Sequence, residues 1–210
     1  MTAEDPAGRG PGGFGPSWAL DAGPGYPPGY PDLIAQLRVL QDTIAGTSPP
    51  DEVVEYVTAA LADVSARLAP YAVDEQHQLF SHLTSLPGRG QAMTPVFVPE
   101  RSDAKGIAGR VTFGRFYLGG NGAVHGGALP LLFDDVLGHL ANTGGRSRSR
   151  TAYLHVDYRS IAPVGAELAL SAWFESEEGR KRLLRGTIRY GDVLCAEAEG
   201  LFVALRPGQS

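Results

Sequence analysis

The segment from Gly120 to Ala141 has the sequence GNGAVHGGALPLLFDDVLGHLA and joins a glycine-rich turn directly to an apolar run. Glycine permits backbone conformations that other residues avoid, and Pro130 suits the first turn of a helix. Apolar residues then recur at helical spacing on one stripe: Leu129, Leu132, Phe133, Val136 and Leu140. The pattern predicts a helix that begins near Gly126 and buries this stripe in a core.

Two adjacent acids, Asp134 and Asp135, interrupt the apolar pattern. At about 100° of rotation per residue they fall on opposite flanks of the stripe, about equally far from its centre. Asp135 has His139 one turn later, which allows a local i,i+4 pair, whereas Asp134 has no such local partner. Periodicity therefore does not distinguish the two acids, and a solvated flanking acid is the commonest outcome for either.

The start of this helix is a candidate binding site for a carbonyl oxygen or an anion. The first amides of a helix have no intrahelical acceptor and point outward. Because the glycines let another group approach the main chain closely, these first amides form a candidate oxyanion hole. A glycine turn with no role in chemistry is the alternative.

The rest of the region from residue 90 to 210 has the alternation of strands. GIAGRVTFGRFYLG (residues 106–119) predicts one strand before the helix. Four more follow it, separated by short turn signals: residues 151–160, 167–178, 180–190 and 193–205. Consecutive strands with hairpin-length links favour an antiparallel sheet with the helix on one face, which is an α+β fold.

The first 89 residues differ in pattern from the rest. Residues 1–30 are dominated by glycine and proline, which predicts a disordered arm. Residues 31–89 form a predicted helical extension, with one helix up to Gly46, a second closed by Pro70, and a third piece around Asp74 to Leu83. The second helix has an apolar stripe that packs on its own domain or faces a partner protein, and packing on the domain is the commoner outcome: Val53, Val57, Ala60, Leu61, Val64 and Leu68.

Composition restricts the class of protein. The 210 residues, 43% of them hydrophobic, suffice for one sizeable core with an appendage, and the formal net charge of -5 argues against a nucleic-acid partner. A single cysteine, Cys195, forms no intrachain disulfide and no cysteine metal site. We expect neither a metal nor a cofactor. No apolar run is long enough to span a membrane, and no signal-peptide pattern is present, which favours a cytoplasmic protein.

The stretch GAVHGGALPLLFDD, placed between a long strand and four further strands, resembles the hotdog-fold acyl-CoA thioesterases. The similarity is to the PaaI-like (4-hydroxybenzoyl-CoA thioesterase-like) branch, covers about residues 90–205, and includes YLHVDYRSIAP. It implies an antiparallel sheet wrapped around a central helix and an acyl-CoA substrate. It also implies a homodimer or a dimer of dimers, with active sites at the subunit interface.

The resemblance assigns roles that periodicity leaves open. In relatives with this motif the amide of the first glycine after the histidine polarises the thioester carbonyl, and this glycine is Gly126 here. The acid nine positions after the histidine is the general base or nucleophile, and this acid is Asp134. His125 is expected to orient the turn, and Gly127 to contact the substrate beside Gly126.

Two positions depart from the family pattern. Many relatives have an asparagine where this chain has Gly119, and Asn121 is the candidate replacement. A serine or threonine on the strand after the helix often completes the site. The position that best matches it here is Tyr153, with Thr151 and His155 nearby.

Three arginines follow the helix in the sequence GGRSRSR: Arg146, Arg148 and Arg150. Spaced guanidinium groups can hold the phosphates of coenzyme A. A solvated basic loop explains each of them equally well.

The resemblance implies hydrolysis of an acyl-CoA thioester to the free acid and coenzyme A. The alternative is a non-catalytic hotdog protein that binds acyl-CoA or acts as a scaffold through its helical extension. A hotdog dehydratase or hydratase is disfavoured, because the sequence lacks a matching Asp-to-His catalytic stretch. The acyl group that the protein prefers is not specified by these residues.

Overall fold

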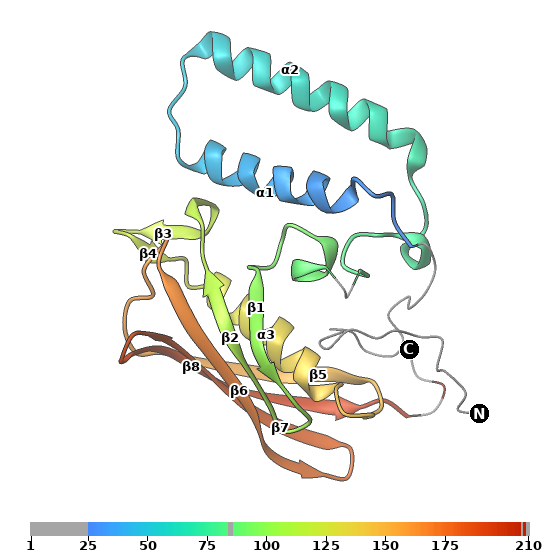
Figure 1. Ribbon diagram of the computed structural model, residues 1–210, viewed down its shortest axis with the longest axis vertical. Coiled ribbons are helices and arrows are strands. Elements are labelled where there is room, and N and C mark those ends of the chain that lie inside the picture. The colour runs from blue at the N-terminus through green and yellow to red at the C-terminus, as the bar shows by residue number, and fades with distance from the viewer. Residues whose placement is uncertain (1–24, 84–85, 207, 209–210) are drawn as a thin grey trace, which may run out of the picture.

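A computed structural model describes residues 25–83, 86–206 and 208, and its centre is a curved antiparallel sheet wrapped around one helix (Figure 1). The sheet has the strand order β1-β2-β6-β7-β8-β5. Its strands are β1 (Phe97–Ser102), β2 (Gly106–Thr112), β5 (Ser149–Tyr158), β6 (Glu167–Glu178), β7 (Lys181–Tyr190) and β8 (Val193–Ala204). The predicted α+β hotdog arrangement, with a central helix and an N-terminal helical extension, is confirmed.

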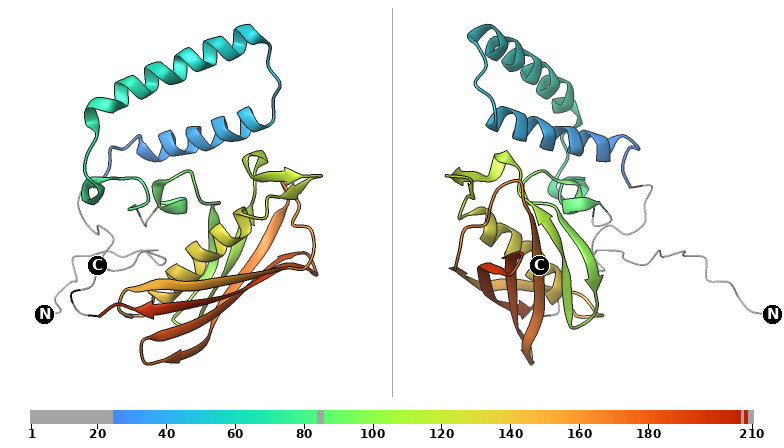
Figure 2. Two further views of the ribbon diagram at one scale, coloured as in Figure 1. Left: turned by 180° about the vertical axis from the view of Figure 1, so that it is seen from behind. Right: turned by 60° about the vertical axis from the view of Figure 1, so that its left-hand side comes forward.

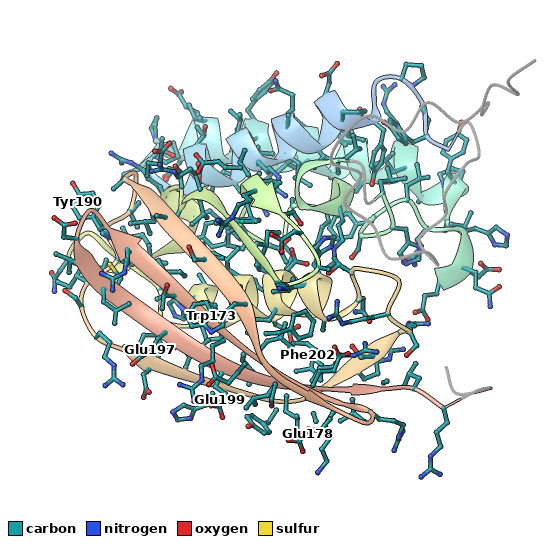
Figure 3. All side chains as sticks on the ribbon, turned by 60° about the horizontal axis from the view of Figure 1, so that its bottom comes forward. Trp173, Glu178, Tyr190, Glu197, Glu199 and Phe202 are labelled. Carbon is teal, nitrogen blue, oxygen red and sulfur yellow. The ribbon has the colours of Figure 1, made fainter. Side chains whose placement is uncertain are left out.

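The central helix is α3 (Ala128–Ala141), which lies on the concave face of the sheet. The predicted stripe is buried, and Phe133 packs so closely on β7 that a Cβ at Gly186 would lie 3.0 Å from its ring. From β8, Phe202 points toward α3, whereas Glu197 and Glu199 lie on the outer face of the sheet (Figure 3). Burial of each large apolar side chain of the α3 stripe contributes roughly 1.5–3 kcal/mol to folding.

The strand predicted over residues 106–119 is interrupted, which the sequence pattern did not indicate. β2 ends at Thr112, and the chain then forms a 3₁₀ turn, η4 (Arg115–Tyr117), before the short pair β3 (Leu118–Gly120) and β4 (Ala123–Val124). The cause is Asp42 of the extension, whose carboxylate accepts a hydrogen bond from the Phe116 amide at 2.9 Å. The same carboxylate leaves no space for a Cβ at Gly114. Strand β1 was also not predicted.

The extension begins with α1 (Tyr30–Ala45), which starts at the last residue of the predicted arm. Residues 1–24, which make up most of that arm, lie outside the described residues. α1 packs against η4 and against a second 3₁₀ segment, η3 (Pro87–Gly90). α2 (Asp51–Leu68) lies outermost, roughly antiparallel to α1 (Figures 1 and 2).

Two expectations about the extension are wrong. No residue of α2 is buried, so its apolar stripe does not pack on its own domain. The predicted third helix, around Asp74 to Leu83, is reduced to one short 3₁₀ turn, η2 (Glu75–His77), and the chain then turns back toward the domain, where Leu83 is buried. A further 3₁₀ turn, η1 (Ala69–Tyr71), directly follows α2. Within the described ranges, no helix is long and apolar enough to cross a membrane.

Candidate active site

The loop before α3 is held by hydrogen bonds on both sides of Gly126. Four of the five consecutive amides from residue 124 to 128 donate at 2.7–3.0 Å, to the oxygens of Ala162, Tyr117 and His125 and to the His125 ring. The fifth, the N–H of Gly126, has no acceptor in the described part of the chain. A fixed loop therefore presents one unbonded donor, as the sequence predicts for an oxyanion contact.

His125 and Tyr158 fix the peptide that follows Gly126. The Gly127 amide donates to Nδ1 of His125 at 3.0 Å, so this nitrogen is the acceptor and Nε2 carries the proton of the neutral ring. The carbonyl of the same peptide accepts a hydrogen bond from the Tyr158 hydroxyl at 2.7 Å. Tyr158 lies at the end of β5 and was missed by sequence reasoning, because no local pattern shows that this strand end meets the loop.

The structure accounts for the glycine at position 119, where the resemblance led us to look for an asparagine. A Cβ at Gly119 would lie 2.7 Å from the Cα of His125, so no larger side chain fits there without movement of the loop. Asn121 is exposed in the β3–β4 turn with φ 50°, a left-handed conformation that asparagine tolerates better than most residues. This conformation accounts for Asn121 without a contact to Gly126.

Asp134 is exposed in the single chain and accepts a hydrogen bond from the Thr151 hydroxyl of β5 at 2.9 Å. Tyr153, the position favoured from the sequence, lies on the outer face instead and donates to Glu199 at 2.9 Å. The β5–β8 register shifts between Thr151 and Tyr153, which places Thr151 rather than Tyr153 beside α3. His155 pairs with Asp157 at 3.3 Å.

Asp135 has different surroundings from Asp134. Its side chain is 17% exposed and forms an ion pair with Arg89 of η3. Burial raises the pKa of Asp135, while the positive charge of Arg89 opposes that rise. Burial, reinforced by the same arginine, lowers the pKa of His139 to about 4. Asp135 thus links α3 to the extension, and its ionic partner is Arg89 rather than the expected His139.

The three arginines after α3 are not equivalent. Arg146 contacts Glu177 at 3.0 Å and the carbonyl of Ala104 at 3.1 Å, and it lies 4.0 Å above the ring of Phe174. These contacts explain Arg146 as a structural residue that holds neighbouring loops. Arg148 is partly exposed and Arg150, on the edge strand β5, is exposed.

A pocket of about 470 Å³ opens beside the loop, between the extension and the start of α3. Its lining comes from α1, from the segment that leads to β1, from η4, from the loop before α3 and from the start of α3 itself: Leu37, Gln41, Phe80, Ala92, Met93, Phe116, Tyr117, His125, Gly127, Ala128 and Leu131. Gly126 therefore stands between two residues that line this pocket.

The chain is similar to known proteins both in a segment of its sequence and in its whole structure. The family model described as "Thioesterase superfamily" matches residues 121–183, which include most of the loop, α3 and β5. The crystal structure of a thioesterase superfamily protein is 30% identical, covers 83% of this chain and 90% of its own length, and superposes with a TM-score of 0.72. The chain belongs to the thioesterase superfamily. Within this superfamily it is 33% identical over 99 residues to the acyl-coenzyme A thioesterase THEM4 of Bos taurus. That match covers 46% of this chain and 40% of THEM4, so the chain spans less than half of that relative.

Proposed function

We propose that this thioesterase superfamily member hydrolyses an acyl-CoA thioester to a free acid and coenzyme A. The observation that carries the proposal is the Gly126 amide, which has no acceptor among the described residues although the neighbouring amides of the loop are bonded. The hydrogen bond between Thr151 and Asp134 supports it, because it orients a carboxylate on the same helix. The name of the relative THEM4 supports the choice of acyl-CoA as the substrate class.

In the proposed reaction the thioester carbonyl oxygen accepts a hydrogen bond from the Gly126 amide. Negative charge develops on this oxygen as the carbonyl is attacked, and the amide at the start of α3 stabilises that charge. Asp134 takes a proton from the attacking water, or attacks the carbonyl itself, while Thr151 holds the carboxylate in place. The leaving thiolate needs no strong acid, since thiols are much more acidic than alcohols; the cysteine thiol has a pKa of about 8.5.

The proposed site is completed by a second copy of the chain. Gly126 precedes α3 and Asp134 lies in its second turn, so the two groups are separated by roughly 10 Å along the helix. Reacting atoms need to approach within about 3.5 Å, so this separation favours a site in which one thioester meets the two groups from different chains. We therefore infer a homodimer in which Gly126 of one subunit faces Asp134 of the other.

Strand β5 is the proposed dimer contact. It carries Thr151 and Tyr158, and it is an edge strand of the six-stranded sheet. Its ten residues are mostly exposed, and a long exposed edge offers unpaired backbone groups to a second strand. Pairing of two β5 strands would continue the sheet across the dimer and bring the two α3 helices side by side.

The activity is tested by measuring thiol release from a panel of short, long and aromatic acyl-CoAs. We expect turnover of at least one class, with release of stoichiometric free acid and coenzyme A. No thiol release from any member would contradict the proposed hydrolysis. Acyl-CoA binding without release would instead favour the non-catalytic binding protein.

A further inference from the structure

The pocket beside the loop is built largely by residues outside the region that matches the family. Leu37 and Gln41 lie one turn apart on α1, and Phe80, Ala92 and Met93 come from the segment between the helical hairpin and the sheet. The match to the superfamily begins only at residue 121. This side of the pocket is therefore a property of the extension rather than of the matched segment.

The lining is mostly apolar, and its polar side chains are Gln41, Tyr117 and His125. It includes no lysine, arginine, aspartate or glutamate, so it offers no cation to the phosphates of coenzyme A. Four large apolar side chains of the lining are between 38% and 55% exposed: Leu37, Phe80, Met93 and Phe116. Large apolar side chains that are exposed together commonly mark a binding surface. The surface is thus suited to a small apolar group.

The pocket lies beside the amide that is proposed to bind the thioester carbonyl. Gly127, Ala128 and Leu131 follow Gly126 along the first turn of α3 and line the pocket on its inner side. A carbonyl carbon held at the Gly126 amide has two substituents, the sulfur of coenzyme A and the acyl group. The apolar substituent fits the apolar pocket, whereas the sulfur leads to the polar and charged part of the substrate.

We propose that the helical extension forms the acyl-binding pocket, and that α1 through Leu37 limits the length of the acyl chain. This inference rests on the proposed acyl-CoA function and adds the substrate class: an apolar acyl group of medium length. The pocket volume of about 470 Å³ falls within the range of about 300–1,000 Å³ that is typical of small-molecule sites. The extension thereby couples an added segment of the chain to substrate choice.

Binding of S-alkyl-CoA thioethers, which cannot be hydrolysed, tests the inference without the need for turnover. Isothermal titration would compare S-ethyl-CoA, S-octyl-CoA and S-hexadecyl-CoA on the full chain. Each buried methylene group is worth about fourfold in affinity, so S-octyl-CoA is expected to bind at least about tenfold more tightly than S-ethyl-CoA. Little further gain is expected for S-hexadecyl-CoA if α1 limits the depth of the pocket as proposed.

Two tryptophan variants on the same helix provide the comparison. L37W fills the pocket and is expected to reduce the preference for octyl over ethyl by at least about tenfold. V39W is the matched control, since Val39 is 57% exposed on α1 and does not line the pocket. It is expected to keep the wild-type preference within about twofold. Circular dichroism would confirm that both variants are folded.

Each outcome bears on a defined claim. An unchanged octyl preference in L37W would overturn the inference, as would an equal loss of S-ethyl-CoA binding, which would place the pantetheine arm in the pocket. No binding of any thioether by the wild-type protein would overturn both the inference and the proposed substrate. Chain-length-dependent binding that L37W abolishes, together with no thiol release from acyl-CoAs, would refute the proposed hydrolysis but support the acyl pocket.

Discussion

Two neighbouring acids on one helix have opposite surroundings, and this difference separates a candidate catalytic group from a structural one. Asp134 is exposed and, among the described residues, accepts a hydrogen bond from Thr151, so its carboxylate is open to a substrate or a second subunit. Asp135 is mostly buried and is neutralised by Arg89. Helical periodicity placed both acids on the flanks of the stripe. The family pattern distinguished them, and non-local contacts now give a physical account of the difference.

Thr151 is expected to act by positioning Asp134. T151V removes the hydroxyl donor but keeps the shape of the side chain, so we expect kcat for thioester hydrolysis to fall about tenfold. T151S retains the donor and is expected to stay within about twofold of the wild type. Steady-state thiol release measures both. Wild-type kcat in T151V would show that the observed hydrogen bond has no role in the reaction.

His139 is expected to make stability depend on pH. Its pKa is lowered from 6.5 to about 4, so the folded protein keeps it neutral at pH values where the unfolded chain protonates it. The stability that is present above pH 6.5 is therefore lost as the pH falls toward 4. Between pH 7 and pH 5 this group should reduce the free energy of unfolding by about 2 kcal/mol. Urea unfolding of H139Q should lack that share, and identical pH dependence in the two proteins would exclude the effect.

At the scale of elements, periodic sequence patterns predict the helices and strands that depend on nearby residues. They do not predict strand breaks or registers that depend on contacts with distant segments. The stripe of α3 and the alternation of the last four strands are periodic, and both were predicted correctly. The break after β2 depends on Asp42 of α1, some 70 residues earlier, and no periodicity records that contact. The choice of Thr151 over Tyr153 depends on a register shift between β5 and β8, which is equally invisible in either strand alone.

The ion pair between Arg89 and Asp135 is expected to fasten η3 to α3. D135N leaves the guanidinium of Arg89 without its negative partner, and the buried Nε of Arg89 already has no hydrogen-bond partner within the part of the chain that the structure describes. Because both side chains retain some exposure, we expect a loss of about 1–3 kcal/mol in the free energy of unfolding. The neighbouring variant D134N should lose less than about 0.5 kcal/mol. Urea unfolding of the two variants makes the comparison, and equal stabilities would show that the pair has no structural role.

At the scale of the whole molecule, the proposed active site is shared by two chains. The helical extension covers one end of the domain, while the edge of β5 is open at the other side of the sheet (Figures 1 and 2). The open edge carries the residues that meet Asp134 and the carbonyl of Gly126. The composition of the chain did not indicate that the β5 edge would be open, because this depends on which strands pair in the sheet.

Complementation between two inactive variants tests the shared site. D134N removes the acid and G126P removes the amide donor, so each homodimer should be inactive. In a heterodimer of the two, one site combines both lesions and the other has neither, so about half of the wild-type kcat per dimer should return. Differently tagged, co-expressed chains allow the heterodimer to be purified. A heterodimer as inactive as its parents would place both groups of a site in one chain.

The most direct test of the central claim is kcat for thiol release by D134N and D135N, measured side by side on an acyl-CoA that the wild-type protein hydrolyses. The assay temperature is chosen so that both variants are folded by circular dichroism. We predict that D134N loses at least about 100-fold in kcat, as expected for a general base, and that D135N stays within about threefold of the wild type. Loss of activity in D135N, with wild-type turnover in D134N, would contradict the account.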